Sequence, residues 1–133
     1  MGNTRRSDGA RPDFFVYAPD PFVFAAAGTL PFNIPIQSDG DFELAYITAN
    51  ATSVTIPSAT LMITDNASNR RLFNVPIALD LITGSGQRPF ALPSTHVFAR
   101  TGTMLVEVTN LVAGANTIRV ALIGWKWMQG GGQ

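Results

Sequence analysis

The fold class is decided by two runs near the C-terminus, Thr103-Met104-Leu105-Val106-Glu107-Val108-Thr109 and Asn116-Thr117-Ile118-Arg119-Val120-Ala121-Leu122-Ile123-Gly124-Trp125-Lys126-Trp127. In the first run, apolar and more polar residues alternate, which is the two-residue period of a strand with one buried face. In the second run, the opposite face also turns apolar over 121–127, so both faces of that strand end should be covered. The connector 110–115 contains Gly114 and is longer than a two-residue turn, which predicts an antiparallel hairpin with a wide loop.

Shorter runs of the same kind precede this pair. Residues 30–36 and 42–47 flank a turn-forming stretch and predict a second hairpin, and residues 59–64 and 70–75 predict a third in the same way. Residues 77–82 fit either a strand or one turn of helix. Together these runs predict about eight short strands with no room for helices between them.

The composition limits the classes that the chain can belong to. Nine prolines and twelve glycines in 133 residues disfavour long helices. The absence of cysteine excludes disulfides, zinc fingers and thiol catalysis. Charged residues make up 14% of the chain and sum to a net charge of zero, unlike the basic surface of a nucleic-acid-binding protein. Because of this charge balance, we do not expect nucleic acid as a partner. No apolar run reaches the length of a membrane span, so we expect no membrane as a partner either.

These observations predict an all-β fold, an antiparallel β-sandwich. A jelly roll is the first choice and an immunoglobulin-like sandwich is the alternative. We expect the sandwich over residues 29–128 and a glycine-rich tail over 129–133. Residues 1–28 are expected to form a flexible and extended N-terminal arm, because Pro19 and Pro21 keep the backbone off a central ladder position. Such a segment is either an edge strand folded over its own core or an arm laid across a neighbouring subunit, and we predict the assembly arm.

Candidate residues for catalysis or metal binding are few. His96 is the only histidine and has no second nitrogen or sulfur ligand, so it is interpreted as structural. The alternating residues Asp39, Asp41 and Glu43 either offer oxygen ligands to a hard cation or form a solvated turn. We expect no catalytic residues, no resident metal and no cofactor.

A series of segments in the second half of the chain suggests a family. The segments are Pro76-Ile77-Ala78-Leu79-Asp80-Leu81-Ile82-Thr83-Gly84, Pro89-Phe90-Ala91-Leu92-Pro93, Val97-Phe98, Gly102-Thr103-Met104-Leu105-Val106-Glu107-Val108-Thr109-Asn110-Leu111 and the closing aromatic strand. In this order they resemble the small jelly-roll auxiliary, cement or decoration proteins on the heads of tailed bacteriophages. The resemblance implies a homo-oligomer, a dimer or trimer, that is made in the host cytoplasm. It would bind the major capsid protein on the capsid exterior and stabilise an icosahedral head.

An interface is expected where aromatic and arginine side chains gather, since both are enriched in protein contacts. An alternative function is a carbohydrate-binding or receptor-binding module of a virion, in which Trp125, Trp127, Tyr17 and Tyr46 would stack on sugars from one exposed face. The predicted interface residues are Phe14, Phe15, Tyr17, Phe22, Phe24, Arg70, Arg71, Arg88, Trp125 and Trp127.

Overall fold

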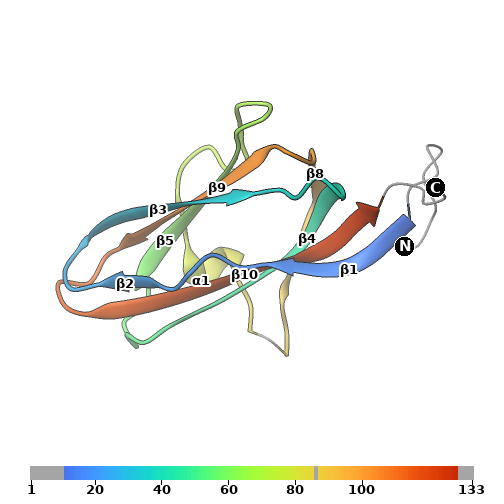
Figure 1. Ribbon diagram of the computed structural model, residues 1–133. Coiled ribbons are helices and arrows are strands. Elements are labelled where there is room, and N and C mark those ends of the chain that lie inside the picture. Colours follow the sequence, from blue (N-terminus) through green and yellow to red (C-terminus); the bar gives the residue numbers. More distant parts are fainter. Residues whose placement is uncertain (1–10, 86, 129–133) are drawn as a thin grey trace.

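The computed structural model describes residues 11–85 and 87–128, which fold into two facing antiparallel sheets (Figure 1). Nearly all regular structure is strand. The elements are β1 (Arg11–Tyr17), β2 (Phe22–Phe24), β3 (Gly28–Pro35), β4 (Gly40–Ala51), β5 (Ala59–Asp65), β6 (Arg70–Arg71), β7 (Ile77–Ala78), α1 (Leu79–Ile82), β8 (Phe90–Phe98), β9 (Thr103–Asn110) and β10 (Asn116–Met128).

The strand order identifies the sandwich as a jelly roll. Sheet A has the order β1-β10-β4-β8, and β2 pairs with β10 further along the edge that β1 occupies. Sheet B has the order β3-β9-β5-β6, with β7 pairing with β5. If β1 with β2 and β6 with β7 each count as one interrupted strand, each sheet has four strands and the sandwich has eight. The all-β prediction and the choice of a jelly roll are therefore confirmed.

Two of the three predicted hairpins are wrong. β9 pairs with β3 and β5 in sheet B, whereas β10 pairs with β1, β2 and β4 in sheet A. Strands β3 and β4 likewise belong to different sheets. The third prediction is confirmed in a short form, because β6 pairs with the end of β5. Alternation reports one buried face, and that signal is the same whether the next strand pairs alongside or stacks about 10 Å away in the facing sheet.

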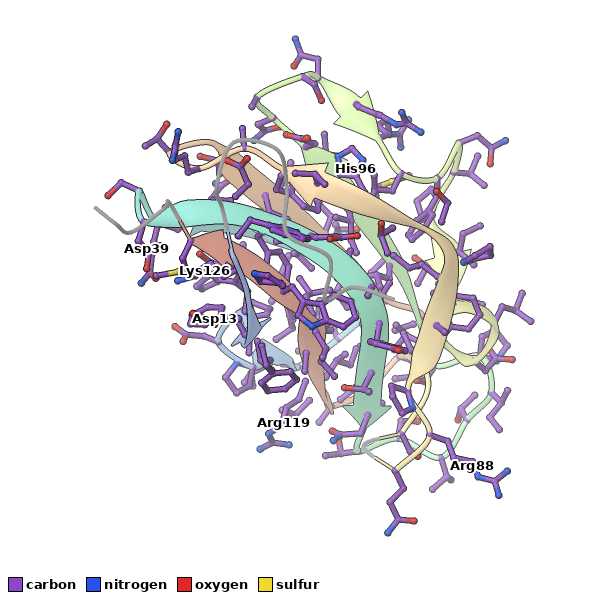
Figure 2. All side chains as sticks on the ribbon, turned by 90° about the vertical axis from the view of Figure 1, so that its right-hand side faces the viewer. Asp13, Asp39, Arg88, His96, Arg119 and Lys126 are labelled. Carbon is purple, nitrogen blue, oxygen red and sulfur yellow. The ribbon has the colours of Figure 1, made fainter. Side chains whose placement is uncertain are left out.

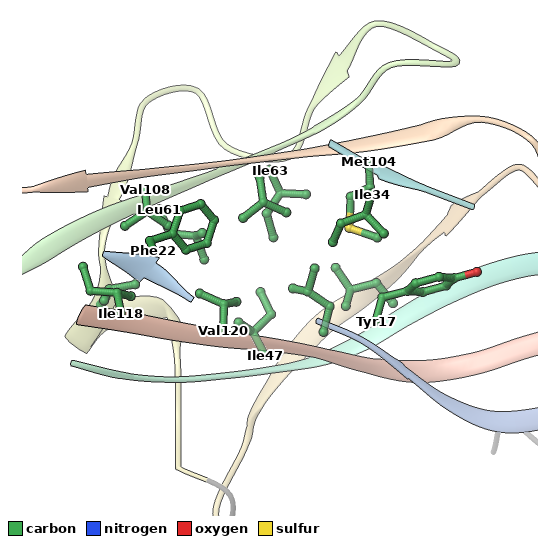
Figure 3. Close-up of a cluster of buried hydrophobic side chains, with 14 of the residues drawn as sticks. Tyr17, Phe22, Ile34, Ile47, Leu61, Ile63, Met104, Val108, Ile118 and Val120 are labelled. Carbon is green, nitrogen blue, oxygen red and sulfur yellow. The ribbon is translucent and has the colours of Figure 1, made fainter. Parts of the chain in front are cut away.

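The core lies between the inward faces of the two sheets (Figure 3). Ile118, Val120 and Leu122 of β10 face it from sheet A, and none of them is more than 3% exposed. Sheet B contributes alternate residues of β9 and β5 from the other side, among them Val108 and Ile63. The alternation along these strands places most of their polar residues outside. The buried exceptions are Asp65, Asn110, Asn116 and Lys126.

The predicted N-terminal arm is wrong for the part of it that the structure describes. β1 pairs with β10 over its whole length, from Arg11 opposite Met128 to Tyr17 opposite Leu122. After a break at 18–21, β2 pairs with the start of β10. The two prolines interrupt the edge strand without excluding it from the sheet, because an edge position leaves one side of the backbone unpaired. The boundary at residue 28 is thus corrected, while residues 1–10 and the tail at 129–133 lie outside the described residues.

The ambiguous segment 77–82 contains both predicted structures, the short strand β7 followed by one turn of helix, α1. This four-residue turn covers part of the core with Leu79. In the described part of the chain, no helix has the length and apolarity needed to cross a membrane.

Candidate functional site

The outer face of sheet A carries an apolar row along its edge. In β1, Phe15 and Tyr17 turn inward, so Phe14 and Val16 turn outward and are 71% and 37% exposed. In β2, Val23 lies between two buried phenylalanines and is 67% exposed. Phe14, Val16 and Val23 are called the edge row below. Val16 lies opposite Ile123 and Val23 opposite Thr117, six residues further along β10, so the edge row extends along this edge of the sheet. Exposed apolar side chains on one face of a sheet are a feature of interaction surfaces.

An aromatic pair lies beside the edge row, toward the middle of the sheet. Trp125 of β10 is opposite Phe14 on one side and opposite Glu43 on the other. Its ring is tilted by 55° against that of Tyr46, with 6.3 Å between the ring centroids. Both rings are half-buried, so each presents part of its surface to solvent.

Glu43 is held in place by two hydrogen bonds on this outer face. Its Oε1 accepts a 2.7 Å hydrogen bond from Nε1 of Trp127, and its Oε2 accepts one of 2.7 Å from the hydroxyl of Thr95. Trp127 is only 6% exposed, which makes it an anchor for the carboxylate rather than an exposed ring. The carboxylate is therefore positioned from both sides.

Irregular pairing opens a hollow next to this carboxylate. β4 has one extra residue, Ala45, between its pairings at Leu44 and Tyr46, whereas β8 has four extra residues, 92–95, between Ala91 and His96. The longer stretch of β8 arches away from β4. It leaves a shallow space of about 310 Å³, called the bulge hollow below, lined by Glu43, Ala45, Tyr46, Ala91, Leu92, Thr95 and Trp125.

The structure separates the predicted interface residues into groups. Tyr17, Phe22, Phe24 and Trp127 are between 3% and 7% exposed, and Phe15 is half-buried against the core. These five side chains pack against other residues of their own chain, although they were predicted as interface residues. Phe14 and Trp125 meet on the outer face of sheet A.

The predicted arginines lie elsewhere on the molecule. Arg70 and Arg71 are exposed in β6. A space between Arg70 and residues 90–96 places this strand beside β8, at the edge of the sandwich away from β1. Arg88 is exposed and points away from the sheets, on the lower side of the view in Figure 2, where Arg119 is also labelled. Whether these arginines contact a partner remains a prediction.

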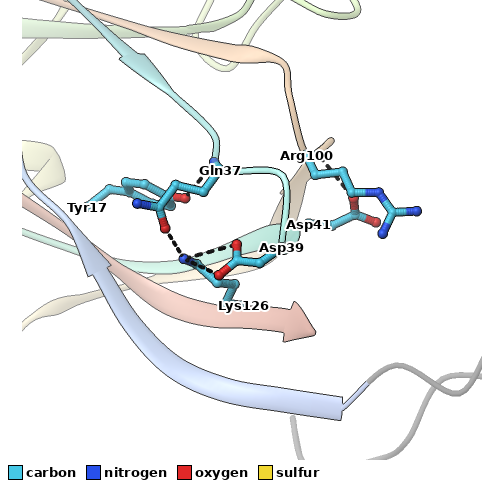
Figure 4. Close-up of polar contacts among 6 residues, drawn as sticks. All are labelled: Tyr17, Gln37, Asp39, Asp41, Arg100 and Lys126. Carbon is cyan, nitrogen blue, oxygen red and sulfur yellow. Dashed lines mark hydrogen bonds and ion pairs between the residues drawn. The ribbon is translucent and has the colours of Figure 1, made fainter. Parts of the chain in front are cut away.

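The possible cation site is not formed. Asp39 pairs with Lys126, and Asp41 accepts a hydrogen bond of 3.0 Å from the backbone N–H of Arg100 (Figure 4). Glu43 is turned to the outer face, where it meets Trp127 and Thr95. Across residues 11–85 and 87–128, no three acidic or histidine side chains gather so as to hold a metal ion.

Lys126 is a buried charged residue that the sequence reading missed. It is 3% exposed, and its ammonium lies 3.7 Å from the ring centroid of Phe15 and 3.3 Å from the Asp39 carboxylate. The ammonium also donates a hydrogen bond to Gln37, whose own backbone N–H donates to the Tyr17 hydroxyl (Figure 4). The sequence did contain a signal for this burial, because Lys126 continues the alternation of Ile118, Val120 and Leu122, whose side chains face inward. Its cluster closes one end of the sandwich.

His96 contacts residues of both sheets. Its Nε2 lies 2.8 Å from Oδ2 of the buried Asp65, which links the edge of sheet A to sheet B. The imidazole also packs edge-on against Phe98 at a centroid distance of 4.7 Å.

No family model matches the chain, and no curated protein matches it. Among solved structures, the chain is similar to the infectious bursal disease virus VP2 subviral particle, with a TM-score of 0.49 and 12% sequence identity. The similar region covers 91% of this chain and 33% of that one, so this chain spans about a third of its length. A likeness of this degree transfers no residue role from one chain to the other.

Proposed function

We propose that the chain is a structural protein of a virion, a cement or decoration protein that oligomerises on the outside of an icosahedral phage head and stabilises it. The observation that carries this proposal is the edge row, with Phe14 71% and Val23 67% exposed on one face of the sheet. Hydration of these apolar side chains is unfavourable in a monomer, whereas a subunit of an oligomer buries them against a neighbour. The resemblance of the sequence segments in the second half of the chain to phage cement proteins supports the same role.

The neighbour would pack against the face of the edge row and not beside the strand. β1 contains Pro12, which lacks a backbone donor, and Asp13, which places a charge at the edge. Both features oppose the addition of a further strand. Apolar packing between copies of Phe14, Val16 and Val23 gives a homo-oligomer, a dimer or trimer, and in a dimer the same row would lie on both sides of the contact.

Attachment to the shell would use a different surface. Arg70 and Arg71 lie at the opposite edge of the sandwich from the edge row, and Arg88 is exposed in the segment that precedes β8. Guanidinium groups pair well with carboxylates at interfaces. An oligomer formed through the edge row leaves these arginines accessible to acidic groups of the major capsid protein. The role is structural and needs no catalytic residue.

The oligomerisation is tested by native mass spectrometry and light scattering of the full chain and of the double variant Phe14→Ser, Val23→Ser. Burial of such a side chain contributes about 1.5–3 kcal/mol, so the two changes should convert a micromolar oligomer into monomers. The matched control is Val54→Ser, because Val54 is 93% exposed in the loop between β4 and β5. The control should assemble like the parent chain.

Attachment is tested by cosedimentation with purified phage heads that lack the protein. The full chain should sediment with the heads, and Arg70→Ala, Arg71→Ala should weaken this without changing the native mass. A parent chain that is monomeric at every concentration, or that is absent from purified virions, would refute the proposed function.

A further inference from the structure

We infer that the bulge hollow binds a single saccharide ring, with Trp125 as its stacking platform and Glu43 as its hydrogen-bond acceptor. This inference goes beyond the structural role proposed above and does not depend on it. The edge row lies on β1 and β2, whereas the bulge hollow opens on the other side of Trp125, between β10 and β8.

The platform is rigid before any ligand arrives. Trp125 is flanked by Phe14 and Glu43 in the neighbouring strands, and Tyr46 packs against it at 6.3 Å between ring centroids. A side chain already held by its neighbours loses little conformational freedom on binding. The half-exposed indole offers an apolar aromatic face of the kind that packs against the C–H face of a sugar ring.

The acceptor is rigid as well. Each oxygen of the Glu43 carboxylate already accepts one hydrogen bond of 2.7 Å, from Trp127 and from Thr95. A carboxylate has about four lone-pair sites, so about two remain for a ligand. Neighbouring hydroxyls of a sugar donate in pairs to such a group. No basic side chain lines the bulge hollow, so no described residue there competes for the carboxylate.

The shape of the bulge hollow suits one ring. Its volume of about 310 Å³ is at the lower end of the range for small-molecule sites. Ala45 and Ala91 are small, and Leu92 adds a second apolar surface. The space exists because residues 92–95 of β8 arch away from β4, and β-bulges of this kind are often found next to binding sites.

A cation is the other ligand that an aromatic pair and a carboxylate attract. Here the carboxylate charge is already spread over two hydrogen bonds from neutral donors, Trp127 and Thr95. The remaining lining is aliphatic and matches C–H groups better than it surrounds an ammonium. These features favour the sugar, and a cation is made an outcome of the test.

The experiment uses the full chain on a glycan array, followed by calorimetric titration with the methyl glycoside of the terminal sugar that binds. Trp125→Ala should weaken the affinity about tenfold, since it removes the stacking surface. Glu43→Gln keeps the size of the side chain and should also weaken binding about tenfold, because one acceptor becomes a donor. Val23→Ser is the control on the same face, because Val23 lies opposite Thr117 and away from Trp125, and its affinity per chain should equal that of the parent.

Four results would overturn the inference. The first is that the folded parent chain binds no glycan on the array. The second and third are that Trp125→Ala retains the parent's melting temperature and affinity, or that Glu43→Gln retains the parent's affinity. The fourth is that tetramethylammonium binds where no glycan does, which would assign the bulge hollow to a cation. Loss of the oligomer in Val23→Ser with unchanged glycan affinity supports the inference and separates it from the proposed assembly.

Discussion

Nδ2 of Asn116 donates a 3.0 Å hydrogen bond to Oδ1 of Asn110, and this bond joins the end of β9 in one sheet to the start of β10 in the other. Both asparagines are 1% exposed. Nδ2 of Asn110 also donates to the carbonyl oxygens of Val112 and Gly114, at 3.1 and 3.3 Å, within the connector itself. Asn116 accepts from the backbone N–H of Ser53 at 3.0 Å. The pair therefore fixes the path by which the chain crosses between the sheets.

Replacing Asn116 by Ala should lower the free energy of unfolding by about 2–3 kcal/mol, because several buried polar groups lose a partner together. Urea unfolding followed by tryptophan fluorescence measures the change. The matched control is Asn33→Ala, since Asn33 is exposed in β3 and its change should stay within about 0.5 kcal/mol. Equal midpoints for the two variants would show that the connector does not depend on this hydrogen bond.

The same asparagines show why the strands could be predicted from the sequence while their partners could not. Asn and Gly between two alternating runs are typical of a hairpin turn. Here Asn110 and Asn116 are buried and brace a crossover instead. The choice between pairing and crossing depends on which distant strands fill the positions beside β9 and β10. A local pattern carries no information about those strands.

The candidate site was predictable only in part, for a similar reason. Trp125 was identified from the sequence as a contact residue, and it does lie on an outer face. The position of Glu43 beside Trp125, and its hydrogen bond from Thr95, could not be predicted. Thr95 and Glu43 are 52 residues apart and meet only through the pairing of β4 with β8. The bulge that opens the hollow likewise depends on how β4 pairs with β8, two strands that are distant in the sequence. Pro93 within the bulge was the only local signal that β8 is irregular.

Phe22 and Phe14 lie on opposite faces of the N-terminal strands, so we expect their replacement to reduce the stability of the monomer by very different amounts. Phe22 is 3% exposed in the core, so Phe22→Ala should cost about 3–5 kcal/mol. Phe14 is 71% exposed, so Phe14→Ala should cost less than about 1 kcal/mol in the monomer. Chemical denaturation of dilute protein, where no oligomer persists, measures both. Similar costs for the two variants would contradict the alternation on which the edge row rests.

Deleting residues up to Ala25 is a stronger test of the corrected boundary. The deletion removes β1 and β2, leaves one edge of β10 uncovered and takes Tyr17, Phe22 and Phe24 out of the core. We expect the truncated chain to be unfolded or aggregated by circular dichroism and light scattering. A soluble β-rich monomer would instead restore the view that this segment is a separable arm.

In the Lys126 cluster, we expect removal of Asp39 to reduce the stability more than removal of Lys126. Asp39 has 44% of its side chain exposed, so after Lys126→Met its carboxylate stays hydrated, and the stability should change by less than about 1 kcal/mol. After Asp39→Ala, the ammonium remains buried with Gln37 and two aromatic rings but loses its ion pair with Asp39, and the cost should be about 1–3 kcal/mol. Thermal and urea unfolding compare the two variants. A larger loss for Lys126→Met would show that the lysine stabilises the sandwich end mainly through its own contacts.

Gly124 is the position where β10 and β4 approach too closely for a side chain. A Cβ atom there would lie 1.8 Å from the carbonyl oxygen of Glu43 and 3.2 Å from the backbone nitrogen of Ala45, next to the bulge of β4. Both contacts are with backbone, so no side-chain rotation relieves them. Gly124→Ala should therefore cost at least about 3 kcal/mol or prevent folding, since the two central strands of sheet A must separate.

Gly114→Ala is the control for this variant, because a Cβ at Gly114 meets no atom within 4 Å and its φ is not in the left-handed region. Alanine there restricts the unfolded chain, so stability should be unchanged or raised by up to about 1 kcal/mol. Urea unfolding of the pair measures the difference. If Gly124→Ala keeps the parent's stability, then β4 and β10 are not in the register that places Trp125 beside Glu43, and the proposed sugar site loses its geometric basis with them.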